Sequence, residues 1–517
     1  LRHNFDPVAD QTVSATTTDN DVAGFTIVQS GGSTSVAETG TTDTFTVVLN
    51  AQPASNVVLS ISSADTGEAT VTSSLTFTNG NWNSAQTVTV TGVDDNIIDG
   101  TITSTITVAV NDGSSDNNFD PVADQTVSAT TTDNDVAGFT IVQSGGSTSV
   151  AETGTTDTFT VVLNAQPASN VVLTITSGDT GEATVTGTLT FTSGNWNSAQ
   201  TVTVTGVDDN LVDGSQTSTI TVAVNDGSSD NNFDPVADQT VSATTTDNDV
   251  AGFTIVQSGG STSVAETGTT DTFTVVLNAQ PASNVVLTIT SGDTGEATVT
   301  GTLTFTSGNW NSAQTVTVTG VDDNLVDGSQ TSTITVAVND GSSDNNFDPV
   351  ADQTVSATTT DNDVAGFTIA QSGGSTSVAE TGTTDTFTVV LNAQPASNVV
   401  LSISSADTGE ATVTSSLTFT NGNWNSAQTV TVTGVDDNII DGTQTTTITA
   451  AVIDAISDDA FDSVANQTVS ATTTDNDVAG FTIAQSDGST SVNESGNTDT
   501  FTLVLNAQPS SDVVLSI

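Results

Sequence analysis

Short runs in which polar residues alternate with apolar ones recur along the whole chain. Thr, Val, Ile and Phe dominate these runs, and Gly, Asn, Asp, Ser and Pro dominate the gaps between them. β-Branched and aromatic residues favour extended backbone, and such gaps are typical of turns. No window has the 3.6-residue period of an amphipathic helix. From Gly24 onward we therefore expect seven strands, over 24–29, 43–50, 56–62, 68–78, 86–92, 102–110 and 125–132.

This strand pattern repeats every 114 residues. The sequence Asp-Asn-Asp-Val-Ala-Gly-Phe begins at Asp19 and again at Asp133, Asp247, Asp361 and Asp475. A fixed period of this size indicates one folded unit per copy in a linear array. The copies predict a C-terminal fragment of a repeat at 1–21, full repeats at 22–135, 136–249, 250–363 and 364–477, and an N-terminal fragment of a repeat at 478–517. We interpret the chain as part of a longer protein.

Four phenylalanines recur in every full copy and are candidate core anchors: Phe25, Phe45, Phe77 and Phe119 in the first. Seven short strands of alternating pattern in about a hundred residues favour an immunoglobulin-like β-sandwich. The predicted fold is thus all-β: a tandem array of immunoglobulin-like seven-stranded antiparallel β-sandwiches, arranged as beads on a rod.

The charge of the chain is extreme and of one sign. The formal net charge is −59, and Arg2 is the only residue among Lys and Arg. Phosphate binding needs clustered cations, so nucleic acid is excluded as a partner and anionic membrane surfaces are disfavoured. Metal cations or a salty medium suit such a surface. We interpret Leu1-Arg2-His3, which hold the only Arg and the only His, as a chain-end feature and not as a functional basic site.

Cysteine is absent, so neither disulfides nor thiolate metal sites hold the fold together. Almost no site exists for trypsin-like cleavage, which suits a protein outside the cell. No transmembrane run is visible, and we expect no direct membrane insertion in this segment. An extracellular or cell-surface location is therefore predicted.

The acidic residues follow the expected direction of the strands. If every connection reverses the chain, the loops after the first, third and fifth strands and the exit of the seventh lie at one end of the sandwich. These segments carry most of the acids of a copy, among them Glu38, Glu68, Asp94 and Asp133. Carboxylates gathered without Lys or Arg raise one another's pKa or recruit a cation. An all-oxygen ligand set favours Ca²⁺ over Mg²⁺, which keeps more of its water.

The same positions resemble the Calx-β domain. The resemblance rests on Ser35-Val36-Ala37-Glu38, on Leu75-Thr76-Phe77, on the acidic motif from Val93 to Gly100 and on Asp133-Asn134-Asp135, and it covers all four full copies. The family binds Ca²⁺ at the domain tip that faces the next domain. The resemblance implies Glu38, Asp94, Asp95, Asp99, Asp133 and Asp135 as ligands. Asp65 is our candidate for an acid that the family's longer third loop supplies, and Asp99 stands where the family often has Glu.

Carried through the copies, the predicted calcium ligands fall into four sets. They are Glu38, Asp65, Asp94, Asp95, Asp99, Asp133 and Asp135; Glu152, Asp179, Asp208, Asp209, Asp213, Asp247 and Asp249; Glu266, Asp293, Asp322, Asp323, Asp327, Asp361 and Asp363; and Glu380, Asp407, Asp436, Asp437, Asp441, Asp475 and Asp477.

Other interpretations of the polar residues stay open. The acids are also compatible with ordinary Asp and Asn turns on a salt-adapted surface. The loop from Asn111 to Asp120 could hold a second cation or be merely solvated. One tryptophan per copy, in a Gly-Asn-Trp-Asn turn, could cover the end of the sandwich or contact a glycan or another partner. These tryptophans are Trp82, Trp196, Trp310 and Trp424.

The residue inventory argues against an enzyme. Cys, Lys and Tyr are missing and the repeats lack His, so catalytic triads, Schiff bases and His-based zinc sites cannot be built in them. We predict a structural extracellular repeat protein: a calcium-stiffened rod or filament segment of a large surface adhesin or matrix fibre. The alternative is a multivalent glycan- or partner-binding module that uses the tryptophan turns. Copies of the same chain could also associate in a fibre through edge strands.

Overall fold

The computed structural model describes residues 9–517 and is built almost wholly of β-strands. The described chain divides into two compact units, one ending at Asn248 and the other running from Asp249 to Ile517. Leu1-Arg2-His3 lie outside the described residues. Among residues 9–517, no helix has both the length and the apolar character needed to cross a membrane.

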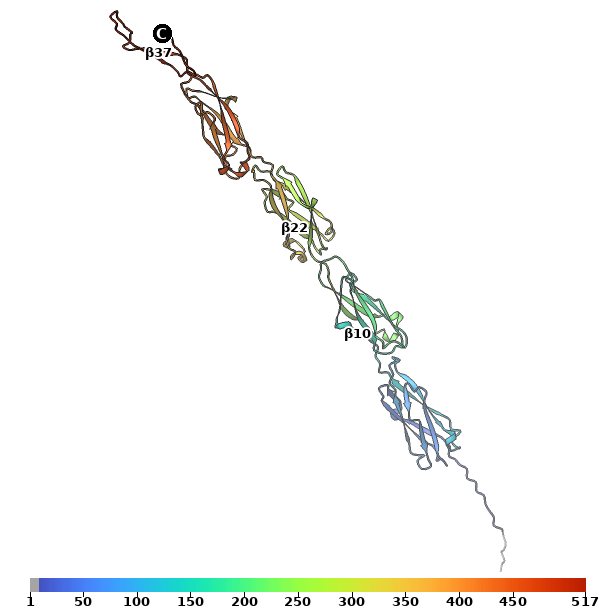
Figure 1. The fold of residues 1–517 in the computed structure, drawn as a ribbon. Coiled ribbons are helices and arrows are strands. Elements are labelled where there is room, and N and C mark those ends of the chain that lie inside the picture. The colour runs from blue at the N-terminus through green and yellow to red at the C-terminus, as the bar shows by residue number, and fades with distance from the viewer. Residues whose placement is uncertain (1–8) are drawn as a thin grey trace, which may run out of the picture. The chain divides into compact units, whose positions relative to one another are not determined.

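Each full copy folds as two packed sheets, which Figure 1 shows most clearly near the labels β10 and β22. In the first copy one sheet has the order β1-β3-β7-β5 and the other the order β2-β9-β8-β4-β6. Their bounds are β1 (Phe25–Gln29), β2 (Thr34–Ala37), β3 (Thr42–Leu49), β4 (Val57–Ser63), β5 (Ala69–Val71), β6 (Ser74–Phe77), β7 (Gln86–Gly92), β8 (Ile102–Val110) and β9 (Gln125–Thr132). Two short 3₁₀ turns, η1 (Ser30–Gly32) and η2 (Asp112–Ser114), complete the copy.

The all-β tandem sandwich fold is confirmed, but the prediction of seven antiparallel strands is wrong in two places. The first predicted strand, β1, is followed by a further strand, β2. The chain leaves the sheet of β1 at this point, and β2 pairs in parallel with β9 in the other sheet. Gly31 and Gly32 make this crossing possible, because they adopt φ values of 69° and 88° that side-chain-bearing residues rarely take. The fourth predicted strand divides into β5, which pairs with β7, and β6, which pairs with β4. Each sandwich therefore has nine strands.

The other copies repeat this order. The second copy has β10 (Phe139–Gln143), β11 (Thr148–Ala151), β12 (Thr156–Leu163), β13 (Val171–Ser177), β14 (Ala183–Val185), β15 (Thr188–Phe191), β16 (Gln200–Gly206), β17 (Gln216–Val224) and β18 (Gln239–Thr246). The third has β19 (Phe253–Gln257), β20 (Thr262–Ala265), β21 (Thr270–Leu277), β22 (Val285–Ser291), β23 (Ala297–Val299), β24 (Thr302–Phe305), β25 (Gln314–Gly320), β26 (Gln330–Val338) and β27 (Gln353–Thr360).

The fourth copy has β28 (Phe367–Gln371), β29 (Thr376–Ala379), β30 (Thr384–Leu391), β31 (Val399–Ser405), β32 (Ala411–Val413), β33 (Ser416–Phe419), β34 (Gln428–Gly434), β35 (Gln444–Val452) and β36 (Gln467–Thr474). Beyond it, β37 (Phe481–Gln485) and β38 (Phe501–Leu505) form a two-stranded hairpin. The 3₁₀ turns of the later copies are η3 (Ser144–Gly146), η4 (Asp226–Ser228), η5 (Asn231–Phe233), η6 (Ser258–Gly260), η7 (Asp340–Ser342), η8 (Asn345–Phe347), η9 (Ser372–Gly374), η10 (Asp454–Ile456) and η11 (Asp459–Phe461).

Phenylalanine anchors the core of every sandwich, as predicted. Phe45 and Phe77 are fully buried between the sheets, and Phe25 and Phe119 are buried in the same core. Inward positions along β3 alternate with outward threonines, so that Thr44 and Thr46 face Thr89 and Thr87 on β7. The burial of alternate residues is what fixes the register of these strands.

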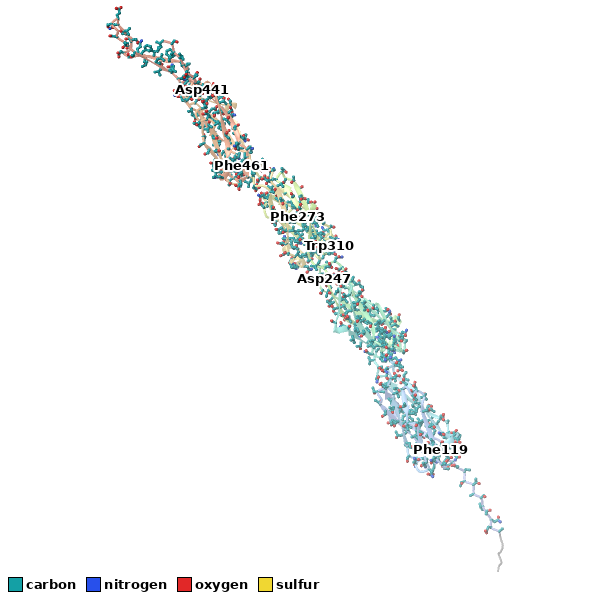
Figure 2. The ribbon with its side chains drawn as sticks, in the orientation of Figure 1. Phe119, Asp247, Phe273, Trp310, Asp441 and Phe461 are labelled. Atoms are coloured by element: carbon teal, nitrogen blue, oxygen red, sulfur yellow. The ribbon has the colours of Figure 1, made fainter. Side chains whose placement is uncertain are left out.

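The two ends of a sandwich carry different loops. We call the end at which the chain enters a copy the upstream end, and the end from which β9 or its equivalent leaves the downstream end. Figure 2 places Phe461, which precedes β36, and Asp441, which follows β34, at opposite ends of the fourth copy. The expected separation of the loops by strand direction therefore holds in this copy.

Candidate metal centre

Four segments bring carboxylates together at the downstream end of the first copy. Glu38 directly follows β2, and its backbone N–H donates to the Thr132 carbonyl at 3.1 Å, which extends the parallel pairing with β9. Its side chain is buried, and Oε2 accepts a hydrogen bond from the Asn134 N–H at 3.2 Å. Pairing of β2 with the last strand of the copy thus aims this carboxylate at the exit of β9.

Glu68 stands immediately before β5, on the loop after β4. Its carbonyl accepts hydrogen bonds from the Val93 N–H at 2.9 Å and the Thr131 hydroxyl at 3.3 Å, so the backbone is held from two other segments. The side chain is only 6% exposed, and Oε2 is buried with no hydrogen-bond partner. A buried carboxylate oxygen without a donor is costly, and it therefore marks a place where a cation fits.

The exit of β9 and the loop after β7 are held to each other by carboxylate hydrogen bonds. Asp133 Oδ2 accepts from the N–H groups of Asp99 at 3.1 Å and Gly100 at 2.9 Å, and Oδ1 accepts from the Asp135 N–H at 2.7 Å. Oδ2 of Asp135 is buried without a hydrogen-bond partner, as Oε2 of Glu68 is.

These carboxylates form two overlapping trios. Ligand oxygens of Glu38, Asp133 and Asp135 all lie within 4.8 Å of one another, and so do those of Glu38, Glu68 and Asp99. Glu38 belongs to both trios and joins them into one acidic cluster. The trio that contains Asp99 recurs in the later copies as Glu152, Glu182 and Asp213 and as Glu266, Glu296 and Asp327.

The pKa values in the cluster show how poorly it tolerates its own charge. Burial, reinforced by the charges of Asp99 and Glu38, raises the pKa of Glu68 to about 7. Glu182 and Glu296 behave in the same way, with pKa values also raised to about 7. Burial and neighbouring carboxylates likewise raise the pKa of Glu38, Asp99 and Asp135. Since the cluster contains no basic side chain, a divalent cation is what would let all of it ionise at neutral pH.

The remaining predicted ligands lie around this cluster in supporting positions. Asp95 Oδ1 accepts from the Ile97 N–H at 2.7 Å, and Asp94 Oδ1 accepts from the Asn134 side-chain amide at 2.9 Å. Asp65 is exposed and accepts from the Gly67 N–H at 3.0 Å. Its charge is nevertheless among those that raise the pKa of Glu68. The same hydrogen bonds recur at Asp209, Asp208 and Asp179, at Asp323, Asp322 and Asp293, and at Asp437, Asp436 and Asp407.

The sequence analysis left Glu68, and with it Glu182, Glu296 and Glu410, out of the predicted ligands. The available signal was the strand direction, which placed Glu68 at the same end as the other acids. The family resemblance points to Asp65 instead, and the alternation within 68–78 gives no sign that the Glu68 side chain turns inward.

The acids at the upstream end are held differently. Asp116 is buried, and its carboxylate accepts from the N–H groups of Ala54 at 2.7 Å, Ser55 at 2.9 Å and Asn118 at 3.1 Å. These backbone hydrogen bonds lower its pKa. Asp112 and Asp120, in the same loop, are exposed. This end therefore uses its one buried carboxylate to hold backbone donors.

The tryptophan turn lies against the sandwich. The Trp82 side chain is half-buried and packs against the hydrophobic core, and its carbonyl accepts from the Leu49 N–H at 3.1 Å. Trp196 and Trp424 pack against the cores of their copies in the same manner. Trp310 is half-buried too, and its carbonyl accepts from the Leu277 N–H at 3.2 Å, as in the first copy. This arrangement favours the interpretation of the tryptophan as a cover over the core.

No curated protein matches the chain. Among solved structures, the chain is similar to "CBD12 from CALX1.2", with 14% identity, a TM-score of 0.17, and coverage of 38% of this chain and 78% of that one. It is also similar to "I-band fragment I67-I69 from titin", with 9% identity, a TM-score of 0.23, and coverage of 66% and 98%. A third match is "surface layer protein SbsC, domains 4-9", with 16% identity, a TM-score of 0.19, and coverage of 87% and 66%.

The pattern of the Calx-beta domain matches residues 19–136, 133–251, 246–371 and 360–487, which together span most of the chain. The chain belongs to the Calx-beta domain family, of which it contains four domains in tandem.

Proposed function

We propose that this protein is a calcium-stiffened structural segment of an extracellular surface or matrix protein. The observation that carries the proposal is the pair of overlapping carboxylate trios joined by Glu38, with buried and unpartnered oxygens on Glu68 and Asp135. A folded domain that keeps such oxygens buried needs a compensating positive charge. The repeats contain neither Lys nor Arg to provide it.

The chemistry of the donors supports Ca²⁺ as the cation. All side-chain donors in the cluster are carboxylate oxygens, and neither sulfur nor imidazole is available in the repeats. Ca²⁺ accepts six to eight oxygens in flexible geometry, whereas Mg²⁺ demands a tight octahedron and retains its waters. Glu38, Glu68, Asp99, Asp133 and Asp135 would hold the ion or ions. Bound calcium would supply charge neutralisation and a crosslink between loops.

The crosslink would act where one copy leads into the next. The cluster joins the loop after β2, the loop before β5, the loop after β7 and the exit of β9. Only Val136, Ala137 and Gly138 separate Asp135 from the first strand of the second copy. A cation that fixes the exit of β9 against three loops would restrict the angle at which the next copy can leave. Without it, repulsion among the carboxylates would loosen the same segment.

Repetition, acidity and the lack of cysteine support a structural role outside the cell. Each near-identical copy adds to the length of the array and repeats the same joint, so the length and stiffness of the whole depend on the number of copies. Metal can replace disulfides as the element that ties a small extracellular domain together. The surface adhesin or matrix fibre named in the sequence analysis is the kind of assembly to which such a segment would belong.

Calcium titration by calorimetry on the whole chain tests the proposal. We expect saturable binding in the wild type, and loss of most of it when Glu38, Glu152, Glu266 and Glu380 are all replaced by Gln. The matched control replaces the exposed Asp112, Asp226, Asp340 and Asp454 by Asn, which removes the same number of charges away from the cluster. Equal calcium binding by both variants, or no binding by the wild type at millimolar Ca²⁺, would overturn the proposal.

Stiffening has its own readout. Small-angle scattering of the whole chain is expected to give a larger maximum dimension in Ca²⁺ than in chelator, because loosened joints bend the array. An identical maximum dimension in the two conditions would leave a calcium-binding protein without the proposed mechanical role.

A further inference from the structure

The loop after β7 has a second face, which carries no charge and touches the following copy. Between Asp95 and Asp99 the chain reads Asn96-Ile97-Ile98. Ile98 is half-buried and packs against the hydrophobic core of the second copy, although it belongs to the first. Val326, at the equivalent place in the third copy, packs in the same way against the core of the fourth. We call this residue the knob.

Backbone hydrogen bonds seat the knob on the next copy. The Gln166 N–H donates to the Asn96 carbonyl at 2.6 Å, and the Ile98 N–H donates to the Gln166 carbonyl at 3.2 Å. Together they form a parallel bridge between Ile97 and Gln166. Gln394 makes the corresponding pair with Asn324 at 2.7 Å and Val326 at 2.9 Å. The contact is therefore specific in register as well as apolar.

The surface that receives the knob can be seen by itself at the upstream end of the first copy. There a hollow of about 280 Å³ is lined by Ala23, Ala51, Pro53 and Phe119, with Gln52, Asn118, Asp19 and Asp21 at its edge. In the second copy, where Ile98 is seated, Ala165 is 1% exposed, whereas the equivalent Ala51 is 8% exposed. We call this hollow the socket. The knob is what covers it where two full copies meet.

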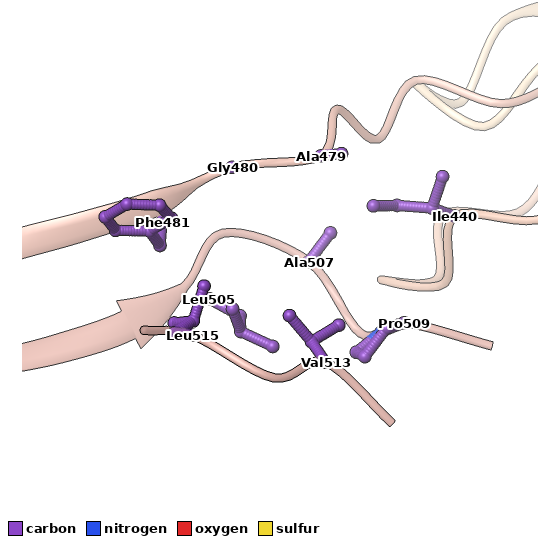
Figure 3. A pocket seen from close by; sticks show the side chains of 9 residues that line it. All are labelled: Ile440, Ala479, Gly480, Phe481, Leu505, Ala507, Pro509, Val513 and Leu515. Carbon is purple, nitrogen blue, oxygen red and sulfur yellow. The ribbon is translucent and has the colours of Figure 1, made fainter. Parts of the chain in front are cut away.

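The knob of the fourth copy makes the same backbone contacts with the segment that follows it. Figure 3 shows Ile440, the knob of the fourth copy, beside Ala507, Pro509 and Val513 of the segment that follows. The Ile440 N–H donates to the Gln508 carbonyl at 3.2 Å, and the Gln508 N–H donates to the Asn438 carbonyl. Ile440 therefore contacts the loop that follows β38, the strand equivalent to β3 of the first copy.

The socket differs at one residue between the joint of the first and second copies and the joint of the third and fourth copies. The Asn232 side-chain amide donates to the Ile98 carbonyl at 2.9 Å and closes the socket over the knob. At the joint between the third and fourth copies the equivalent residue is Ala460, which packs against the core and has no amide to donate. The first joint thus has a latch that the later joint lacks, and its knob is Ile where the later one is Val.

We propose that successive repeats recognise each other through this knob and socket, and that the amide latch grades the stiffness of each joint. The partner of the surface is the next copy of the same repeat. Neither the knob nor the latch is among the proposed calcium ligands. The inference therefore goes beyond the proposed function, and it stands or falls on different residues.

The test uses the whole chain, which is free of cysteine, with one pair of spin labels at a time. Thr70→Cys with Thr184→Cys reports the first joint, and Thr298→Cys with Thr412→Cys reports the later one. All four threonines are exposed, and each lies on the short strand that follows the buried glutamate of its copy. Pulsed electron resonance gives the distribution of distances between labels, and an undocked population should widen that distribution about twofold.

We expect Ile98→Ala to widen the distribution at the first joint and to leave the later joint unchanged. Asn232→Ala should widen it by a smaller factor, and Ala460→Asn should narrow it at the later joint. Val28→Ala, which removes the same kind of side chain from an exposed site, is the matched control. A thermal unfolding profile like that of the wild type shows that each variant is folded.

Measurement in saturating Ca²⁺ and again in chelator separates this inference from the proposed function. A knob effect in either condition supports the inference, even if calorimetry finds no calcium binding. Unchanged distributions with Ile98→Ala, and also with the more severe Ile98→Asp, would overturn it whatever calcium does. A change with Ile98→Ala but none with Asn232→Ala or Ala460→Asn would overturn the grading by the latch.

Discussion

Two carboxyl groups of the first copy are equally buried, and yet their pKa values are shifted in opposite directions. Glu68 at the downstream end and Asp116 at the upstream end are each 6% exposed. The pKa of Glu68 is raised to about 7, mainly by burial and then by neighbouring carboxylates, whereas three backbone N–H donors lower the pKa of Asp116. The comparison teaches that burial alone does not decide the state of an acid. The hydrogen-bond donors within reach decide whether the ionised carboxylate is stabilised by the protein itself or needs a cation.

The largest expected difference between the two ends concerns calcium itself. Binding to the folded state alone stabilises it by about 2.7 kcal/mol per site at a hundred times the dissociation constant. For domains of this size that corresponds to a rise in melting temperature of about 10 °C. Scanning calorimetry of the whole chain in Ca²⁺ and in chelator measures the rise. Melting at the same temperature in both would mean that the downstream carboxylates need no cation.

The upstream carboxylates should matter for stability in either condition. Replacing Asp116, Asp230, Asp344 and Asp458 together by Ala leaves buried N–H donors without acceptors, so the melting temperature should fall by about 5 °C or more. The fall should be equal in Ca²⁺ and in chelator. The exposed Asp112, Asp226, Asp340 and Asp454, replaced by Ala, serve as the control and should have little effect. A loss confined to the calcium-bound protein would contradict the division of roles.

The two ends should also respond oppositely to pH in chelator. Because the pKa of Glu68 is raised from 4.5 to about 7 in the folded state, its ionisation favours the unfolded chain. Its contribution to stability is fully present below pH 4.5 and is lost as the pH rises through about 7. Asp116, with a lowered pKa, contributes in the other direction and loses its contribution only in acid. Denaturant titrations between pH 5 and pH 8 should therefore show declining stability in chelator, and a stability independent of pH would contradict this.

The smallest effect is expected from neutralising one acid per cluster. Glu68→Gln removes a charge that the cluster repels, so it should stabilise the first copy slightly in chelator. The same change should weaken calcium binding at that copy, because a carboxylate ligand is lost. Asp65→Asn, at the exposed rim of the loop, is the comparison. The effect of Glu68→Gln on the melting temperature should be positive in chelator and negative in Ca²⁺. An effect of the same sign in both conditions would argue against Glu68 as a ligand.

Much of the downstream end could be predicted from the chain alone. The alternation of polar and apolar residues predicts the strands, and the direction of the strands puts Glu38, Asp99 and Asp133 at one end of the sandwich. The crossing at Gly31 and Gly32 could not be read in this way, because the alternation of 34–37 looks the same whichever sheet it joins. The division of 68–78 between two sheets escaped prediction for the same reason.

The side chains that matter most could not be assigned by pattern. Glu68 is followed by a strand that is only three residues long, and nothing in its spacing shows that its carboxylate turns inward. Ile98 lies between acids in a loop, where an apolar residue is usually exposed. Its burial depends on the neighbouring copy, and a single repeat read in isolation has no neighbour. The ligand set itself, the domain boundaries and the contact of the tryptophans with a glycan or another partner remain predictions.

The crossing of the chain from β1 to β2 has a mechanical consequence. It places the first strand of the second sheet beside the last strand, β9, and the two run in parallel over Thr34 to Ala37. Tension applied to the two termini of such a domain reaches β2 through β1, and it then pulls β2 and β9 in opposite directions along their length. All their hydrogen bonds then bear the load at once and must break together, whereas an antiparallel terminal pair would open one bond at a time. Each repeat is therefore built to yield by sliding and not by peeling, which is the geometry that resists a steady pull.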